Sequence, residues 1–217
     1  MKSIEDSITK LSSGFKMISE EEHQRRLNAE DARKQIDHNT RVAVIMSKTN
    51  LPKRHSSATI EFDGEWGSTY HKLLKSLTTG FLCALVGTRG NGKTQIGVQL
   101  IKANANRLKT SRFCCATEFF MDIKATYGKA DKSEKDVIKD YLKPDLLVID
   151  EIGQRSDTEW ENRLLFFLVN ERYEDCKDTL FVGNLEASQL VTALGPSIAS
   201  RMNETGGIIN CNWPSFR

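Results

Sequence analysis

The chain has 217 residues, of which 28% are charged and 39% hydrophobic, and its formal net charge is +2. This length suits one substantial domain with an appendage, and the composition is ordinary for a water-soluble protein. No apolar run approaches the roughly 18 residues that a bilayer span requires, and the N-terminus lacks the apolar core of a secretory signal. We therefore expect a cytoplasmic location without membrane association. With so little net charge, nucleic-acid binding would require a local basic patch.

The five cysteines are odd in number, and no two of them have the C-x-x-C spacing of a zinc or redox site. Most lie in apolar stretches that resemble strands. We expect free, buried thiols in a reducing compartment and no structural zinc.

The first 54 residues have an excess of basic over acidic side chains. Five apolar residues near the start are spaced by four, three, four and three positions, which predicts the apolar side of an amphipathic helix: Ile4, Ile8, Leu11, Phe15 and Ile18. Such a face packs either on the chain's own body or on a partner. The charged stretch 20–41, read as a solvated helix ending before Pro52, separates it from the rest and favours a partner or self-association. We therefore predict a partner-binding region and linker at 1–54 and one domain at 55–217.

Strand and helix patterns alternate beyond residue 80. Short apolar runs predict five strands, and periodic apolar positions predict a helix at 94–108 and another around Trp160, capped by Ser156 or Asp157. This alternation predicts an α/β domain whose parallel five-stranded sheet has helices on both faces. The strands are expected at 81–86, 112–116, 146–149, 179–182 and 207–211.

Residues 87–94 read GTRGNGKT and fit the P-loop pattern G-x-x-x-x-G-K-[ST] between a strand and a helix. Backbone N–H groups of such a loop, with the helix N-terminus, bind phosphates. Lys93 is expected to reach the β- and γ-phosphates and the Thr94 hydroxyl to ligate Mg²⁺. The predicted ATP-binding residues are Gly87, Thr88, Arg89, Gly90, Asn91, Gly92, Lys93 and Thr94.

Two further strands end in polar residues. The run LLVI at 146–149 is followed by Asp150 and Glu151, and in a parallel sheet these carboxylates lie beside the P-loop. We expect Asp150 to hold Mg²⁺ and Glu151 to polarise the attacking water, which favours ATP hydrolysis over binding alone. Asn184 follows the strand at 179–182 and either orients this water or is a turn residue.

The order of these motifs resembles an AAA+ ATPase. The segments LGPSIASRM at 194–202 and CNWPSFR at 211–217, with LLVIDEIG at 146–153, are similar to the DnaC family of replicative helicase loaders. The resemblance covers residues 80–217, whereas residues 1–54 match only in layout. The compact form of the chain favours a loader of the phage or prophage type.

The resemblance implies an ATPase, weak alone, that loads a hexameric replicative helicase onto single-stranded DNA and self-assembles with the helicase's help. Asn184 matches the sensor of the γ-phosphate, and Arg201 matches the arginine finger that completes a neighbouring subunit's site. Without the resemblance, Arg201 would be read as a surface helix charge. The sequence departs from the family at Ser197, where an arginine is usual. The C-terminal helical lid of most AAA+ proteins is not expected here.

Residues 117–144 fall where such proteins carry an inserted helical element for single-stranded DNA. Basic and aromatic side chains there suit phosphates and stacked bases, and Lys124, Tyr127 and Lys129 are the candidates. In the other interpretation, Phe119 and Phe120 belong to the core and the lysines are merely solvated.

Two other functions remain open from the sequence. An IstB-like transposition helper ATPase would bind duplex DNA and a transposase. A nucleotide-gated adaptor would hydrolyse negligible ATP. The presence of Glu151 counts against this function, because a protein that only binds ATP has no need of that carboxylate.

Overall fold

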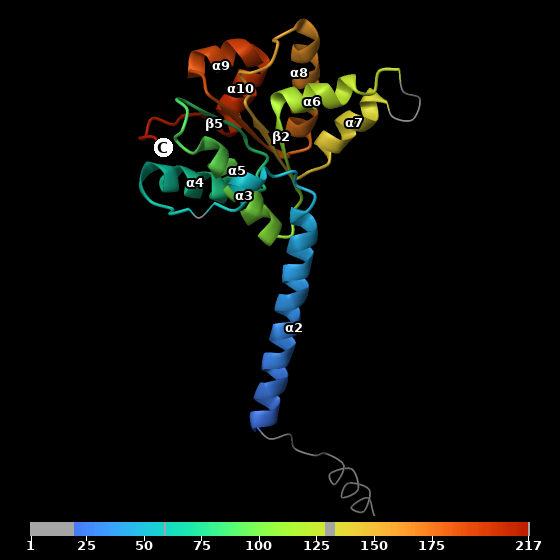
Figure 1. Ribbon diagram of the computed structural model, residues 1–217, viewed down its shortest axis with the longest axis vertical. Coiled ribbons are helices and arrows are strands. Elements are labelled where there is room, and N and C mark those ends of the chain that lie inside the picture. The colour runs from blue at the N-terminus through green and yellow to red at the C-terminus, as the bar shows by residue number, and fades with distance from the viewer. Residues whose placement is uncertain (1–19, 59, 129–132, 217) are drawn as a thin grey trace, which may run out of the picture. The chain divides into compact units, whose positions relative to one another are not determined.

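The computed structural model describes residues 20–58, 60–128 and 133–216 (Figure 1). The chain forms two compact units, residues 1–41 and 42–217. This division lies before the predicted boundary at 54/55, because Met46 and Leu51 pack against the core of the second unit. The Thr49 carbonyl also accepts a hydrogen bond from the Phe113 N–H at 2.8 Å. Residues 42–54 are therefore part of the larger unit rather than a linker.

The solvated helix predicted at 20–41 is present as the main part of α2 (Glu20–Met46), and none of its residues is buried. Ion pairs between residues four positions apart support it, among them Arg26 with Glu22 at 3.0 Å and Lys34 with Glu30 at 2.8 Å. The apolar seam Ile4, Ile8, Leu11, Phe15 and Ile18 lies outside the described residues. Within the described ranges, no helix combines the length and apolar character that a membrane span needs.

The second unit is built on the predicted sheet of five parallel strands, in the order β2-β3-β4-β1-β5. Each strand is four to six residues long, as expected for parallel strands covered on both faces. The strands are β1 (Leu82–Val86), β2 (Ser111–Cys115), β3 (Leu146–Asp150), β4 (Asp178–Gly183) and β5 (Gly207–Asn210).

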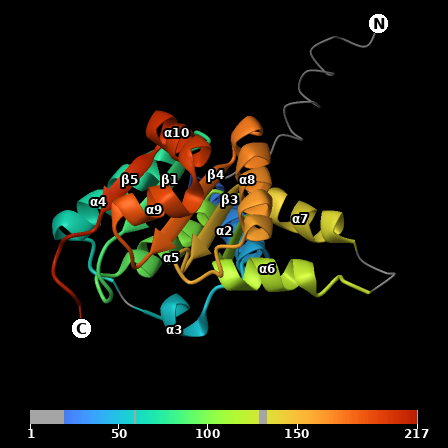
Figure 2. The ribbon, with the colours of Figure 1, turned by 90° about the horizontal axis from the view of Figure 1, so that it is seen from above.

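Two hydrophobic cores lie on opposite faces of the sheet, because alternate residues of each strand point to opposite sides. On β1, Ala84 belongs to one core and Leu85 to the other. The first core includes α6 (Ala116–Lys124), α7 (Glu134–Leu142), α8 (Glu159–Glu174), α9 (Ala187–Leu194) and α10 (Pro196–Thr205); the second includes α4 (Gly64–Ser76) and α5 (Lys93–Asn106) (Figure 2). The short α3 (Lys53–Ser56) adjoins α5.

Two local features differ from expectation. The N-cap of α8 is Thr158, not Ser156 or Asp157, and its side chain accepts the Glu161 N–H at 3.3 Å. Thr158 and Glu161 have capping-box spacing, so each satisfies the other's backbone N–H. Helix α4 was not predicted, although its buried residues Trp66, Tyr70 and Leu73 follow a helical period.

Arg172 on α8 is fully buried and joins several segments of the domain. Its Nε donates to the Thr179 hydroxyl at 2.9 Å, and Nη2 donates to the Asp178 carbonyl at 2.6 Å. Nη1 donates to the carbonyls of Tyr141 and Pro144 at 3.0 and 2.9 Å. Burial lowers the pKa of Arg172 to about 10, so the guanidinium remains charged at neutral pH.

Candidate nucleotide-binding site

The P-loop connects β1 to α5, as predicted. Gly90 and Gly92 have φ values of 91° and 76°, in the left-handed region that favours glycine. A Cβ on Gly87 would lie 2.8 Å from the Cys211 carbonyl oxygen, so a larger residue would collide with the backbone there. These glycines allow the tight curl in which consecutive N–H groups face one concave side.

Lys93 begins α5, and its side chain lies against the P-loop. Its Nζ donates to the carbonyls of Gly87 and Thr88 at 3.0 and 2.6 Å, and to Asn91 Oδ1 at 2.9 Å. Burial lowers the pKa of this amine below its ordinary value. The loop therefore holds the Lys93 amine at the N-terminus of α5, where phosphate oxygens would be expected.

Asp150 and Thr94 are brought together from β3 and α5. The Thr94 hydroxyl donates to Asp150 Oδ2 at 2.7 Å, and Asp150 is buried. Burial raises the pKa of Asp150, although the hydrogen bonds from Thr94 and from the Glu151 N–H oppose this shift. A hydroxyl and a buried carboxylate are oxygen ligands of the kind that Mg²⁺ prefers, so this pair fits the ion that accompanies ATP.

Glu151 follows Asp150 with a φ of 55°, which is unusual for a residue other than glycine. Such backbone strain persists only where neighbouring bonds hold it, and here the N–H of Ile152 donates to the Val182 carbonyl at 3.0 Å. Cys115 pairs in register with Asp150. Burial, together with the carboxylates of Glu151 and Asp150, raises the pKa of the Cys115 thiol to about 11.

The structure places Asn184 directly after β4, and its side chain is exposed. The last residue of β4, Gly183, pairs with Val86, which immediately precedes the P-loop. Asn184 thus lies at the same sheet edge as the loop, where its role as a sensor remains a prediction.

Arg201 contacts α8. Its Nη2 donates to Asn170 Oδ1 at 2.6 Å, and its guanidinium lies 5.7 and 5.3 Å from the ring centres of Phe166 and Tyr173. Phe166 is exposed, so this cation lies beside an accessible apolar surface. The structure brings Arg201 to α8 of its own subunit, and its action on a neighbouring subunit remains a proposal.

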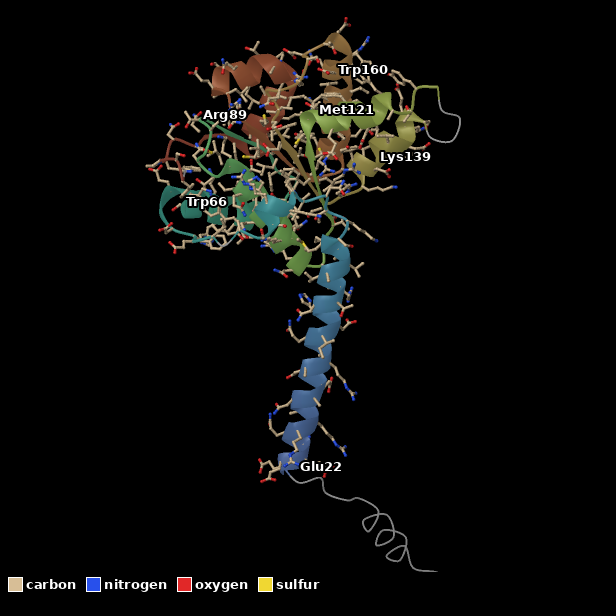
Figure 3. All side chains as sticks on the ribbon, viewed as in Figure 1. Glu22, Trp66, Arg89, Met121, Lys139 and Trp160 are labelled. Atoms are coloured by element: carbon tan, nitrogen blue, oxygen red, sulfur yellow. The ribbon has the colours of Figure 1, made fainter. Side chains whose placement is uncertain are left out.

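The predicted DNA-binding element forms α6 and α7. Phe119 and Phe120 are buried, so the interpretation that they are core residues is correct. Lys124 Nζ lies 5.1 Å from the ring centre of Trp160, and the rings of Tyr127 and Trp160 meet edge to face at 6.5 Å. Met121, which follows the buried Phe120 on α6, is exposed (Figure 3). Lys129 lies outside the described residues.

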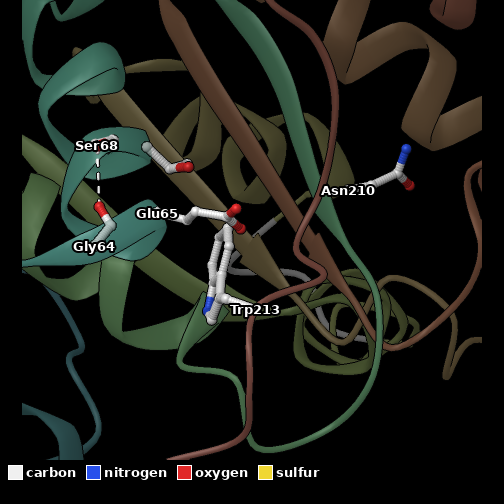
Figure 4. A pocket seen from close by; sticks show the side chains of 6 residues that line it. Gly64, Glu65, Ser68, Asn210 and Trp213 are labelled. Atoms are coloured by element: carbon white, nitrogen blue, oxygen red, sulfur yellow. Dashed lines mark hydrogen bonds between the residues drawn. The ribbon is translucent and has the colours of Figure 1, made fainter.

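No sequence pattern indicated that aromatic residues lie around the P-loop. Trp66 of α4 and Trp213 donate their indole N–H groups to the carbonyls of Gly92 and Asn91, at 3.1 and 2.6 Å. An open hollow of about 620 Å³ adjoins Trp213 (Figure 4). Its other lining residues are mostly polar: Gly64, Glu65, Ser68, Thr69 and Asn210.

The sheet order and this loop define a P-loop domain of the AAA+ type. The chain belongs to the family of IstB-like ATP binding proteins, whose model matches residues 6–197. It is 25% identical over 132 residues to the replicative helicase loader DnaC of Escherichia coli strain K12, covering 60% of this chain and 54% of DnaC. It is also 30% identical over 139 residues to the uncharacterized protein YdaV of the same strain, covering 62% of this chain and 54% of YdaV.

The fold agrees with these relatives. The crystal structure of the DnaC helicase loader superposes with a TM-score of 0.63 at 19% identity, covering 73% of this chain and 99% of that chain. The chain spans about half the length of the curated relatives that it matches. The predicted resemblance to DnaC and the predicted fold are therefore confirmed, and ATP binding is the property that the family model names.

Proposed function

We propose that this protein is an ATPase that loads a hexameric replicative helicase onto single-stranded DNA in the cytoplasm. The similarity to DnaC supports the choice of partner. The observation that carries the proposal is the short path between the nucleotide site and the aromatic and basic surface around Trp160. Helix α6 begins directly after Cys115, the partner of Asp150 in the sheet, and ends at Lys124.

This arrangement suits a protein whose hold on DNA depends on its nucleotide. Lys93 and the P-loop N–H groups bind the phosphates, while Thr94 and Asp150 hold Mg²⁺, which neutralises phosphate charge. Glu151 accepts a proton from the attacking water, and Asn184 orients that water. Arg201 supplies a cation to the site of a neighbouring subunit, so turnover is slow until subunits assemble.

Single-stranded DNA would meet the surface formed by Lys124, Tyr127 and Trp160, with Lys129 contributing further charge. Stacking of bases on aromatic rings contributes about 1–3 kcal/mol per base. The first unit, with its seam from Ile4 to Ile18, would bind the helicase.

The test is capture of the purified replicative helicase by the full chain and by residues 42–217, each with ATP and with ADP. We expect the full chain to capture the helicase, and the shorter chain to bind ATP but capture none. Equal capture by both chains would disprove the role of the first unit.

The second candidate is a transposition helper, which the family match to IstB-like proteins favours. Fluorescence anisotropy with single-stranded and duplex oligonucleotides distinguishes the two functions. A loader should prefer the single strand and lose that preference in Tyr127→Ala. A preference for duplex DNA, with no helicase capture, would establish the helper instead.

A further inference from the structure

Carbonyls of three consecutive P-loop residues accept hydrogen bonds from outside the loop. Gly90 accepts the backbone N–H of Phe216 at 3.1 Å. Asn91 accepts the indole N–H of Trp213 at 2.6 Å, and Gly92 accepts that of Trp66 at 3.1 Å. Two of these donors belong to the segment 211–216, which follows β5.

These bonds determine where the opposite sides of the same peptide units point. In a trans peptide, the C=O of one residue and the N–H of the next point in opposite directions. Donors that hold the carbonyls of Gly90, Asn91 and Gly92 outward therefore turn the next three N–H groups inward. Those N–H groups belong to residues 91, 92 and 93, on the concave side where a P-loop meets phosphate oxygens.

The contact between Trp213 and the loop is buried. Asn91 is 1% exposed and Trp213 is 9% exposed. The Asn91 side chain donates to the Cys211 carbonyl and accepts from Lys93 Nζ, so the segment also touches the residue that holds the lysine. A Cβ on Gly92 would lie 3.2 Å from the ring of Phe216, which packs directly on the loop.

We propose that Trp213 and the backbone N–H of Phe216 are positioning residues for phosphate binding. They touch no phosphate in this role, and they act by orienting the peptide units of the P-loop. The inference rests on the nucleotide binding in the proposed function and not on helicase loading. Because the oriented groups meet phosphates and not the base, losing them weakens binding of ATP and of tripolyphosphate by the same factor.

The test compares two matched pairs of variants. Phe216→Pro removes the N–H that Gly90 accepts, whereas Phe216→Ala keeps it, and this side chain is 66% exposed, so both variants should fold. Trp213→Phe removes the indole N–H, and Tyr141→Phe is its control. Tyr141→Phe also removes one hydrogen-bond donor from an aromatic side chain, because the Tyr141 hydroxyl donates to Asp122 on α6 at 2.7 Å.

Dissociation constants for ATP and tripolyphosphate, each with magnesium, are measured by competition with a fluorescent ATP analogue. We expect Phe216→Pro and Trp213→Phe each to raise both constants about three- to tenfold, the loss of one hydrogen bond. The controls Phe216→Ala and Tyr141→Phe should leave the tripolyphosphate constant unchanged. Trp213→Phe and Tyr141→Phe should lower the midpoint temperature of thermal unfolding by similar amounts.

Four results would overturn the inference. Unchanged constants in both test variants would show that the bonds orient nothing. A loss for ATP without a loss for tripolyphosphate would assign these residues to the nucleoside. An equal loss in Phe216→Ala would assign the effect to the ring. A wild-type chain that binds neither ligand would overturn the proposed function, and this inference with it.

Discussion

The helix at 20–41 and the domain at 42–217 are stabilised in opposite ways. The helix buries none of its side chains and depends on local contacts such as the Arg26–Glu22 pair, each contributing a few tenths of a kcal/mol in a helix. The domain buries both faces of its sheet and holds even Arg172 in its interior. Nucleotide chemistry needs the second kind of order, because its groups must keep fixed positions. A helix without a core of its own is suited to binding another surface.

The largest expected effect concerns the nucleotide site. It tests whether one domain contains every residue that ATP hydrolysis needs, as it contains its own hydrophobic cores. Arg201→Ala should lower ATP turnover of the assembled protein by about 10³-fold or more, the range for an arginine finger, and leave ATP binding unchanged. Mixing Arg201→Ala with Lys93→Ala subunits should restore part of the turnover, because each supplies what the other lacks. A mixture as inactive as its components would show that the arginine acts within its own subunit.

Next in size is the loss of the catalytic carboxylate. Glu151→Gln should lower turnover by about 10²–10⁴-fold, because the amide cannot accept a proton from water. ATP affinity should remain close to wild type in a filter-binding assay. Glu159→Gln, on the exposed start of α8, is the control. Normal turnover in Glu151→Gln would show that Glu151 is not the catalytic base, whereas negligible turnover in the unaltered chain would favour the adaptor hypothesis.

The third prediction compares a substitution in the interior of the domain with one in the exposed helix α2, by their effect on the free energy of unfolding. Arg172→Met should lower the free energy of unfolding by about 3–5 kcal/mol, since the buried carbonyls of Tyr141, Pro144 and Asp178 lose their donor. Urea denaturation followed by tryptophan fluorescence measures it. Arg26→Met in the exposed helix is the matched control and should leave the midpoint unchanged. Equal shifts in both variants would remove the distinction between the two regions.

The smallest effect concerns the helix alone. Ala29→Gly should weaken α2 by about 1 kcal/mol, because glycine loses more backbone freedom than alanine, and this should appear as reduced ellipticity at low temperature. ATP binding should not change. If nucleotide affinity fell together with helicity, the helix and the domain would be coupled and not independently stabilised.

Much of the site could be predicted because its signals are local. The P-loop consists of eight consecutive residues, and Asp150 and Glu151 stand at the end of an apolar strand. Parallel-sheet geometry alone therefore brings these two acids to the P-loop. The element at 117–144 was ambiguous, because Phe119 and Phe120 suit a core as well as a stack of bases. Only their burial, with Lys124 and Tyr127 placed around Trp160, distinguishes these interpretations.

The sequence by itself determined the strands, their parallel arrangement and the phosphate site, because apolar periodicity and a glycine-rich loop act over a few neighbouring residues. Tertiary structure decided what supports that loop. Trp66 and Trp213 are 26 and 122 positions away from the residues that they bond, and no local pattern announces a pairing at such separation. It also decided the interior place of Arg172, since a charged residue in a helix is buried only where enough carbonyl groups converge to satisfy its donors.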